Sequence, residues 1–118
     1  MLARDTKIYK DAYSMTKDVF DITKKMKTEY RSSVARRIEE LSIALAMKVV
    51  EANLFAPTSE ERQQILGHDF VVIQEQLFFM LSLAFDLKLL NYKQHATLLR
   101  YLDNIGKQAT GWRKSTSR

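Results

Sequence analysis

Few side chains in this chain have the chemistry of a catalyst or a metal ligand. His68 and His95 are the two histidines, and there is no cysteine. The positions three residues before them hold Ile65 and Tyr92, so the Glu-x-x-His pattern of di-iron helical bundles is missing. No phosphate-binding glycine loop or serine-nucleophile motif occurs either. The sequence therefore predicts a protein that is not an enzyme and has no catalytic residue, metal or cofactor.

The two histidines are better explained as structural residues. His68 precedes Asp69, but adjacent residues of a helix point in different directions, so Asp69 is not expected to orient this imidazole as a base. We expect His68 at the surface beside a charge. His95 lies near an apolar stripe, and we expect it to be packed with its polar atoms satisfied.

Positive charge is the strongest chemical signal in the sequence. The net charge is +5, from 19 Lys and Arg against 14 Asp and Glu. Residues 1–53 carry eleven basic against eight acidic residues, residues 54–91 two against five, and residues 92–118 six against one. Basic ends that flank an acidic, apolar middle are typical of a protein with a polyanionic partner.

Six basic residues near predicted helix ends are the candidate nucleic-acid contacts. They are Arg36, Arg37, Lys24, Lys25, Arg113 and Lys114. The four near helix C-termini are favourable by about 0.3–1 kcal/mol each without any ligand. Arg36 and Arg37 lie near a helix start instead, and they are the preferred phosphate contacts. Glu40, at helical spacing, is expected to pair with one of these two arginines.

Apolar periodicity predicts the elements that position these residues. Stripes such as Ile8, Ala12 and Met15, with steps of three and four, predict helices over about 5–27, 32–54, 59–90 and 93–114. A chain of 118 residues with three Gly and one Pro fits one all-helical domain. Four long helices with short connections predict an antiparallel up-down-up-down four-helix bundle.

Several helix ends have recognisable signals. Thr58 followed by Glu61 is a capping-box pattern, which predicts a helix start at about Ser59. Gly67 should weaken the first turns of that helix. Asn91 could end this helix in a left-handed conformation or cap the next one. The cap of the second helix stays open between Thr28, Ser32 and Ser33.

The second and third helices have more apolar surface than one bundle can bury. Phe78, Phe79, Leu81 and Phe85 cannot all face the same axis, and burying one Phe is favourable by roughly 1.5–3 kcal/mol. We therefore expect a homo-oligomer joined through the outer faces of these helices, with a wide monomeric core as the alternative. The predicted interface residues are Phe78, Leu81, Phe85, Met47 and Val50.

The C-terminal segment combines an apolar stripe, two glycines, the one Trp and a basic tip. Trp112 occupies the next position of the last stripe, so it is expected in the core or an interface, with base stacking as the second choice. The run from Ile105-Gly106 to Gly111-Trp112-Arg113-Lys114-Ser115 resembles the accessory variability determinant proteins of diversity-generating retroelements. The motif positions are Gly111, Trp112, Lys114 and Ser115, while Thr110 stands where this family often has a glycine.

The resemblance covers about residues 9–115 and extends to Glu51-Ala52-Asn53 and the Leu83 to Tyr92 passage. The four-helix proteins of 23S rRNA intervening sequences are similar in architecture. Their Pro-x-Asn-Ile-Ala-Glu-Gly passage is absent here, which favours the retroelement family. The alternative function is a structural oligomerisation module of the intervening-sequence type, with no nucleic-acid role. A small-molecule pocket in the bundle is a third, less favoured class.

The resemblance implies a pentameric barrel of four-helix protomers with a basic surface. It implies binding to a reverse transcriptase and to template RNA, and to cDNA, in support of mutagenic retrohoming, with no catalytic site in the accessory protein itself. It also implies a cytoplasmic protein from a bacterium, an archaeon or a phage. The sequence starts without an apolar leader, and its longest apolar run, residues 77–85, is far short of the roughly 20 residues of a membrane span. No membrane partner is expected.

Overall fold

A computed structural model describes residues 2–116, and every element in this range is helical. Three of its rods are α1 (Lys7–Thr23), α2 (Arg36–Asn53) and α5 (Tyr92–Thr116). The remaining rod consists of α3 (Glu60–Gln64), the π-helical turn η4 (Ile65–Asp69) and α4 (Phe70–Asp86). Short turns precede α1 (η1, Ala3–Asp5) and α2 (η2, Thr28–Tyr30, then the π-helical η3, Arg31–Ala35). The predicted all-helical class with four long helical segments is confirmed.

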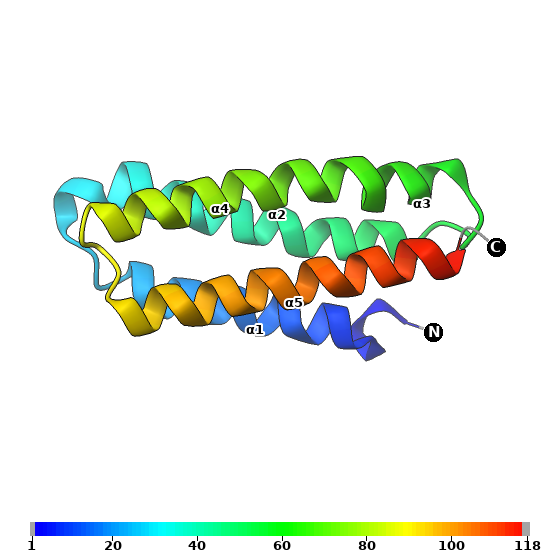
Figure 1. Ribbon diagram of the computed structural model, residues 1–118, viewed down its shortest axis with the longest axis horizontal. Coiled ribbons are helices and arrows are strands. Elements are labelled where there is room, and N and C mark those ends of the chain that lie inside the picture. Colours follow the sequence, from blue (N-terminus) through cyan, green and yellow to red (C-terminus); the bar gives the residue numbers. More distant parts are fainter. Residues whose placement is uncertain (1, 117–118) are drawn as a thin grey trace.

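The four rods lie side by side along the long axis of the molecule (Figure 1). Contacts join α1 to α2, α2 to α4, α4 to α5 and α5 to α1, so the rods occupy the corners of a square. The molecule measures 47 × 23 × 22 Å. The start of α1 and the end of α5 lie at one end, and the α1–α2 and α4–α5 connections lie at the other (Figure 1).

The core lies along the centre of this square. Each rod contributes the apolar stripe that the periodicity predicted, because only that side of an amphipathic helix can leave water. The largest fully buried apolar side chains are Met15, Val19, Ile38, Leu45, Val49, Phe70, Leu77, Leu81, Leu98 and Ile105. Within residues 2–116, no helix is both long and apolar enough to cross a bilayer.

The first helix ends at Thr23, four residues earlier than predicted. Arg31 explains this, because its guanidinium donates hydrogen bonds to the main-chain carbonyls of Lys24 and Met26. Basic side chains commonly satisfy the free carbonyls at a helix C-terminus. The buried Thr23 hydroxyl also donates to the Glu39 carboxylate at 2.5 Å, which ties the end of α1 to α2.

The third rod ends at Asp86 rather than near residue 90. Lys88 is left-handed, with φ 63°. The Lys88 amide donates to the Phe85 carbonyl at 2.9 Å, and the Leu89 amide donates to the Ala84 carbonyl at 2.8 Å. These two bonds form a Schellman motif, which usually has glycine at the left-handed position. Because residue 88 is a lysine, the sequence lacks the glycine that usually indicates such a helix end.

Side-chain caps begin the last two rods. Asn91 caps α5, since its Oδ1 accepts from the Gln94 amide at 2.7 Å and Gln94 Oε1 accepts from the Asn91 amide at 2.9 Å. Of the two roles considered for Asn91, capping is therefore the one observed. Ser59, rather than Thr58, caps α3 by accepting from the Arg62 amide at 3.1 Å. The helix start is as predicted, but the capping residue is one position later.

Candidate nucleic-acid interface

The six predicted nucleic-acid contacts fall at two opposite ends of the molecule. Lys24 and Lys25 follow the end of α1, and Arg36 and Arg37 begin α2, all at the end with the α1–α2 connection (Figure 1). The final turns of α5, which hold the other two residues, lie at the opposite end. The structure therefore separates the six residues into two groups about the length of the molecule apart.

Arg36 and Arg37 are the most available of these cations. The π-helical turn η3 leads directly into α2 and places both arginines in its first turn, where both are exposed. Within the described chain neither forms a salt bridge, and the expected pairing with Glu40 does not occur. An exposed helical ion pair gains only a few tenths of a kcal/mol, too little to hold two long side chains together.

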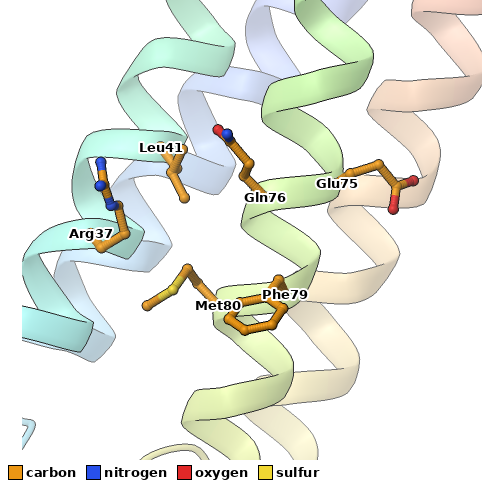
Figure 2. A pocket seen from close by; sticks show the side chains of 6 residues that line it. All are labelled: Arg37, Leu41, Glu75, Gln76, Phe79 and Met80. Atoms are coloured by element: carbon orange, nitrogen blue, oxygen red, sulfur yellow. The ribbon is translucent and has the colours of Figure 1, made fainter.

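Arg37 also lines the largest groove described, about 440 Å³ between α2 and α4. Figure 2 shows Arg37 and Leu41 on α2 facing Met80 on α4, with Phe79 at the outer edge and Glu75 pointing away from Arg37. The groove thus combines an apolar floor with one cation and one carboxylate.

Lys24 and Lys25 are exposed beside this end of α2. Lys24 lies 3.4 Å from Asp21, with both side chains about two-thirds exposed, so this surface ion pair adds little stability. No salt bridge of Lys25 occurs in the range 2–116. Both lysines therefore remain accessible to an anionic partner.

Trp112 packs on a buried arginine. The Arg62 guanidinium carbon lies 4.2 Å from the centroid of the Trp112 ring, and Arg62 is only 6% exposed. Arg62 Nη1 donates to the Phe55 carbonyl at 3.4 Å, while its Nε has no partner in the described structure. Burial lowers the pKa of the Arg62 guanidinium from its ordinary value. Because the Arg62 guanidinium covers one face of the ring, Trp112 anchors the end of the bundle. The structure thus favours the predicted packed position over base stacking.

Arg113 is held against the same end of the bundle. Its carbonyl accepts from Gln63 Nε2 at 3.2 Å, and its Cδ lies 3.1 Å from the point where a side chain at Gly67 would begin. Gly67 thus has a packing role in addition to the weakening of the first helical turns that the sequence predicted. Lys114 is exposed. The side chain of Ser115, the last predicted motif residue, lies outside the described structure.

His68 lies at the surface beside a carboxylate. His68 Nδ1 lies 2.9 Å from Asp69 Oδ1, so these neighbours do contact one another, contrary to the sequence-based expectation. They lie in the π-helical turn η4, whose geometry differs from that of the α-helix assumed. The hydrogen bond from His68, followed by the charge of Lys48 at 3.7 Å, holds the pKa of Asp69 below its usual value.

His95 stacks on Phe85 with the ring centroids 4.3 Å apart. The packed position is as predicted, but His95 Nε2 is buried with no hydrogen-bond partner in the described structure, so its polar atoms are not all satisfied. Residues 2–116 contain no group of three His, Cys, Asp or Glu that could hold a metal ion.

The predicted interface residues divide into buried and exposed members. Leu81 is 1% exposed and belongs to the core of the protomer, which corrects its assignment to an outer face. Phe85 is half-buried against His95 and the core. Phe78 and Met47 are 50% and 52% exposed, and Val50 is half-buried. Leu81 is offset from Phe78 by only about 60° around α4, and the structure shows that this offset is enough to place Leu81 in the core while Phe78 stays half-exposed.

The surface of the molecule has two different sides. The rod over residues 60–86 has one basic and five acidic residues, and α4 itself has no Lys or Arg, whereas α5 has five basic residues and one acidic. The exposed large apolar residues of α2 and α4 are Ile43, Met47, Val71, Val72, Phe78 and Phe79. Apolar surface therefore gathers on α2 and α4, and positive charge on α5.

Sequence analysis missed part of this charge. Lys93, Arg100 and Lys107 are exposed on α5 but are scattered along the sequence, so they do not read as a cluster. Their seven-residue spacing was the available signal.

Comparison with protein-family models and with curated proteins finds no match.

Proposed function

We propose that this chain is a non-catalytic accessory subunit of a diversity-generating retroelement, which binds the reverse transcriptase and template RNA. In this proposal the protomer is an antiparallel up-down-up-down bundle that assembles into a homo-oligomer, a pentamer in the resembled family. The resemblance rests on Gly111, Trp112 and Lys114, in register with the family motif.

The separation of apolar and basic surface is the observation that carries the proposal. An oligomer that covered the outer faces of α2 and α4 would remove large apolar side chains such as Phe79, 67% exposed, from water. The basic residues of α5 would stay outside such a contact, whereas Arg36 and Arg37 belong to α2 itself, and Arg37 lines the α2–α4 groove. Assembly would then multiply a weak charge attraction through avidity.

A salt titration of RNA binding tests the nucleic-acid part of this function. Affinity should fall steeply between about 50 and 200 mM salt, because phosphate contacts release counterions. Replacing Arg36 and Arg37 together by Glu should weaken binding and lower the slope of log affinity against log salt by about two. The matched control replaces Lys10 and Lys17 by Glu.

The same titration distinguishes the proposed function from the alternative, a structural oligomerisation module. Undetectable RNA binding at low salt by an otherwise intact oligomer would remove the nucleic-acid role. The chain would then be a structural oligomerisation module. Co-purification with a retroelement reverse transcriptase tests the second partner, and failure of the two folded proteins to associate would contradict it.

A further inference from the structure

Four basic residues of α5 stand at intervals of seven residues. They are Lys93, Arg100, Lys107 and Lys114, and all four are exposed. Seven residues are close to two helical turns, so each residue lies about 10.5 Å further along the same face and is offset by only about 20°. Together they form a straight row about 32 Å long. We call these four residues the α5 ridge.

The α5 ridge faces solvent. The residues on the opposite side of α5 are the buried ones, Leu98, Leu102, Ile105 and Ala109. Asp103 is the one acidic residue of α5; it lies 3.0 Å from Lys107, with both side chains largely exposed. In the described structure Lys93 and Arg100 form no salt bridge.

The neighbouring carboxylates of α1 already have partners. Asp11 Oδ2 accepts from Lys7 Nζ at 2.7 Å and from Gln108 Nε2 at 2.6 Å. Asp18 is hydrogen-bonded by Tyr101. These bonds hold the two acids in the seam between α1 and α5, where Asp18 and Asp21 also line a shallow groove together with Lys93. Of the ridge cations, Lys107 is paired with Asp103, whereas no carboxylate of the described residues lies within salt-bridge distance of Lys93 or Arg100.

Gly111 on the same face has no explanation within the protomer. A side chain at Gly106 would collide with Gln74, and one at Gly67 would press on Arg113, so packing explains both of those glycines. A side chain at Gly111 would meet nothing within 4 Å, and its φ is not positive. Glycine weakens a helix, and the bare backbone that it leaves at Gly111 would let another molecule approach closely.

We propose that the α5 ridge binds the sugar-phosphate backbone of a nucleic-acid duplex, with Gly111 allowing that backbone to approach the helix. This inference rests on the proposed function and identifies the form of nucleic acid bound. The ridge begins at the end of the molecule where Arg36 and Arg37 lie (Figure 1), but α2 and α5 occupy opposite corners of the bundle, so the two sets of cations lie on different sides of the molecule.

The composition of the ridge favours a duplex over a single strand. The positions between the cations hold Thr97, Asn104 and Gly111, none of which can stack on an unpaired base. A row of about 32 Å spans about nine steps at the roughly 3.4 Å spacing of a B-form duplex. An anionic lipid surface would attract the same cations by charge alone, so vesicle binding is measured beside duplex binding.

The test measures binding of a mixed-sequence RNA duplex, of about 20 base pairs, as a function of salt. The ridge variant replaces Lys93, Arg100, Lys107 and Lys114 by Gln. The control variant makes the same change of net charge at the exposed Arg4, Lys17, Lys27 and Lys88. We expect the ridge variant to bind at least about tenfold more weakly at 0.1 M salt, with a slope lowered by about three to four.

A second pair of variants changes shape without changing charge. Gly111→Gln should weaken duplex binding at an unchanged salt slope, because its side chain blocks close approach. Thr110→Gln, at the neighbouring exposed position off the ridge, should bind as the wild type does. Circular dichroism melting checks that every variant is folded, and Gly111→Gln with wild-type affinity would overturn the role of Gly111.

Other outcomes separate this inference from the proposed function. Equal losses in the ridge and control variants would overturn the ridge and leave RNA binding intact. Tighter binding of the wild type to single-stranded RNA of the same length would overturn the duplex assignment, as would a ridge-dependent affinity for phosphatidylserine vesicles with none for the duplex. Wild-type protein that binds neither RNA at low salt would overturn the proposed function together with the ridge.

Discussion

At the scale of single residues, the C-terminal motif acts first as a structural anchor. Trp112 packs under the buried guanidinium of Arg62, and Arg113 lies against Gly67 on the preceding rod. These contacts fasten the final turns of α5 to the α3 end of the molecule. Arg113 and Lys114 are consequently held in a fixed position. Such fixed residues favour binding of a partner, because less conformational entropy is lost on association.

The Arg62–Trp112 contact can be tested by substitution, with the fluorescence of Trp112 as a probe. Arg62→Ala should lower the free energy of unfolding by about 2 kcal/mol, since a desolvated cation–π contact is lost and the Phe55 carbonyl loses a donor. Urea unfolding measures this change. Because Trp112 is the one tryptophan, its fluorescence should also shift to longer wavelength.

The control for this prediction is Arg36→Ala, which removes an exposed arginine and should change stability by less than about 0.5 kcal/mol. Equal effects of the two substitutions would show that Arg62 contributes nothing beyond its helix propensity. An unchanged Trp112 emission in Arg62→Ala would show that the guanidinium does not shield the ring.

At the scale of elements, hydrogen bonds at the rod ends decide where each helix stops. Arg31 ends α1, the Schellman motif at Lys88 ends α4, and the reciprocal bonds of Asn91 and Gln94 start α5. The α4–α5 connection is therefore well defined although it contains no glycine and no proline. That connection places Lys93, the first residue of the α5 ridge.

Lys88→Gly tests the strain at the end of α4. A non-glycine residue in the left-handed region is disfavoured by roughly 1 kcal/mol, which glycine avoids at the cost of a more flexible unfolded chain. We expect the substitution to raise stability by about 0.5 kcal/mol. Thermal unfolding by circular dichroism measures the change.

The matched substitution is Lys93→Gly in the first turns of α5, where the backbone is helical. Here glycine should destabilise by roughly 0.5–1 kcal/mol, the opposite sign from Lys88→Gly. If both substitutions destabilised equally, Lys88 would not be left-handed in solution.

At the scale of the whole molecule, different rods carry different kinds of surface. Apolar residues dominate the outer faces of α2 and α4, while α5 has a row of cations. An interface formed by α2 and α4 could therefore form without burying the α5 cations, although Arg37 lines the groove between these two helices. The seam between α1 and α5 adds hydrogen-bonded carboxylates, among them Asp11, whose pKa is lowered by Lys7 and Gln108 against the opposing effect of burial.

The proposed assembly predicts a mass well above the 13.8 kDa of one chain at micromolar concentration. Replacing Met47 and Phe78 together by Glu should reduce the mass to that of one chain, because two charges would be buried in each interface. Light scattering after gel filtration measures the mass.

The control for assembly is Tyr92→Glu, which changes a 79% exposed aromatic residue at the start of α5 and should leave the mass unchanged. A wild-type protein of one-chain mass would remove the oligomer from the proposed function. Dissociation by Tyr92→Glu alone would place the interface on the other side of the molecule.

Periodicity in the sequence was enough to establish the helical class, four rods and most of the core. The reason is that amphipathic stripes such as Ile8, Ala12 and Met15 depend only on local spacing, which the helix itself imposes. The same local information located the surplus apolar surface near Phe78. It could not assign Leu81 to the core, because that depends on which side of the helix its neighbours cover.

Tertiary packing alone decided which residues meet across rods. The contact of Arg62 with Trp112 joins positions fifty residues apart, and neither type nor spacing indicates it. The sequence does not distinguish Gly67 from Gly111. Only the packed structure shows that Gly67 makes room for Arg113, whereas Gly111 faces open space. Local spacing sets the shape of each helix, whereas the partners of a side chain depend on how separate helices pack together.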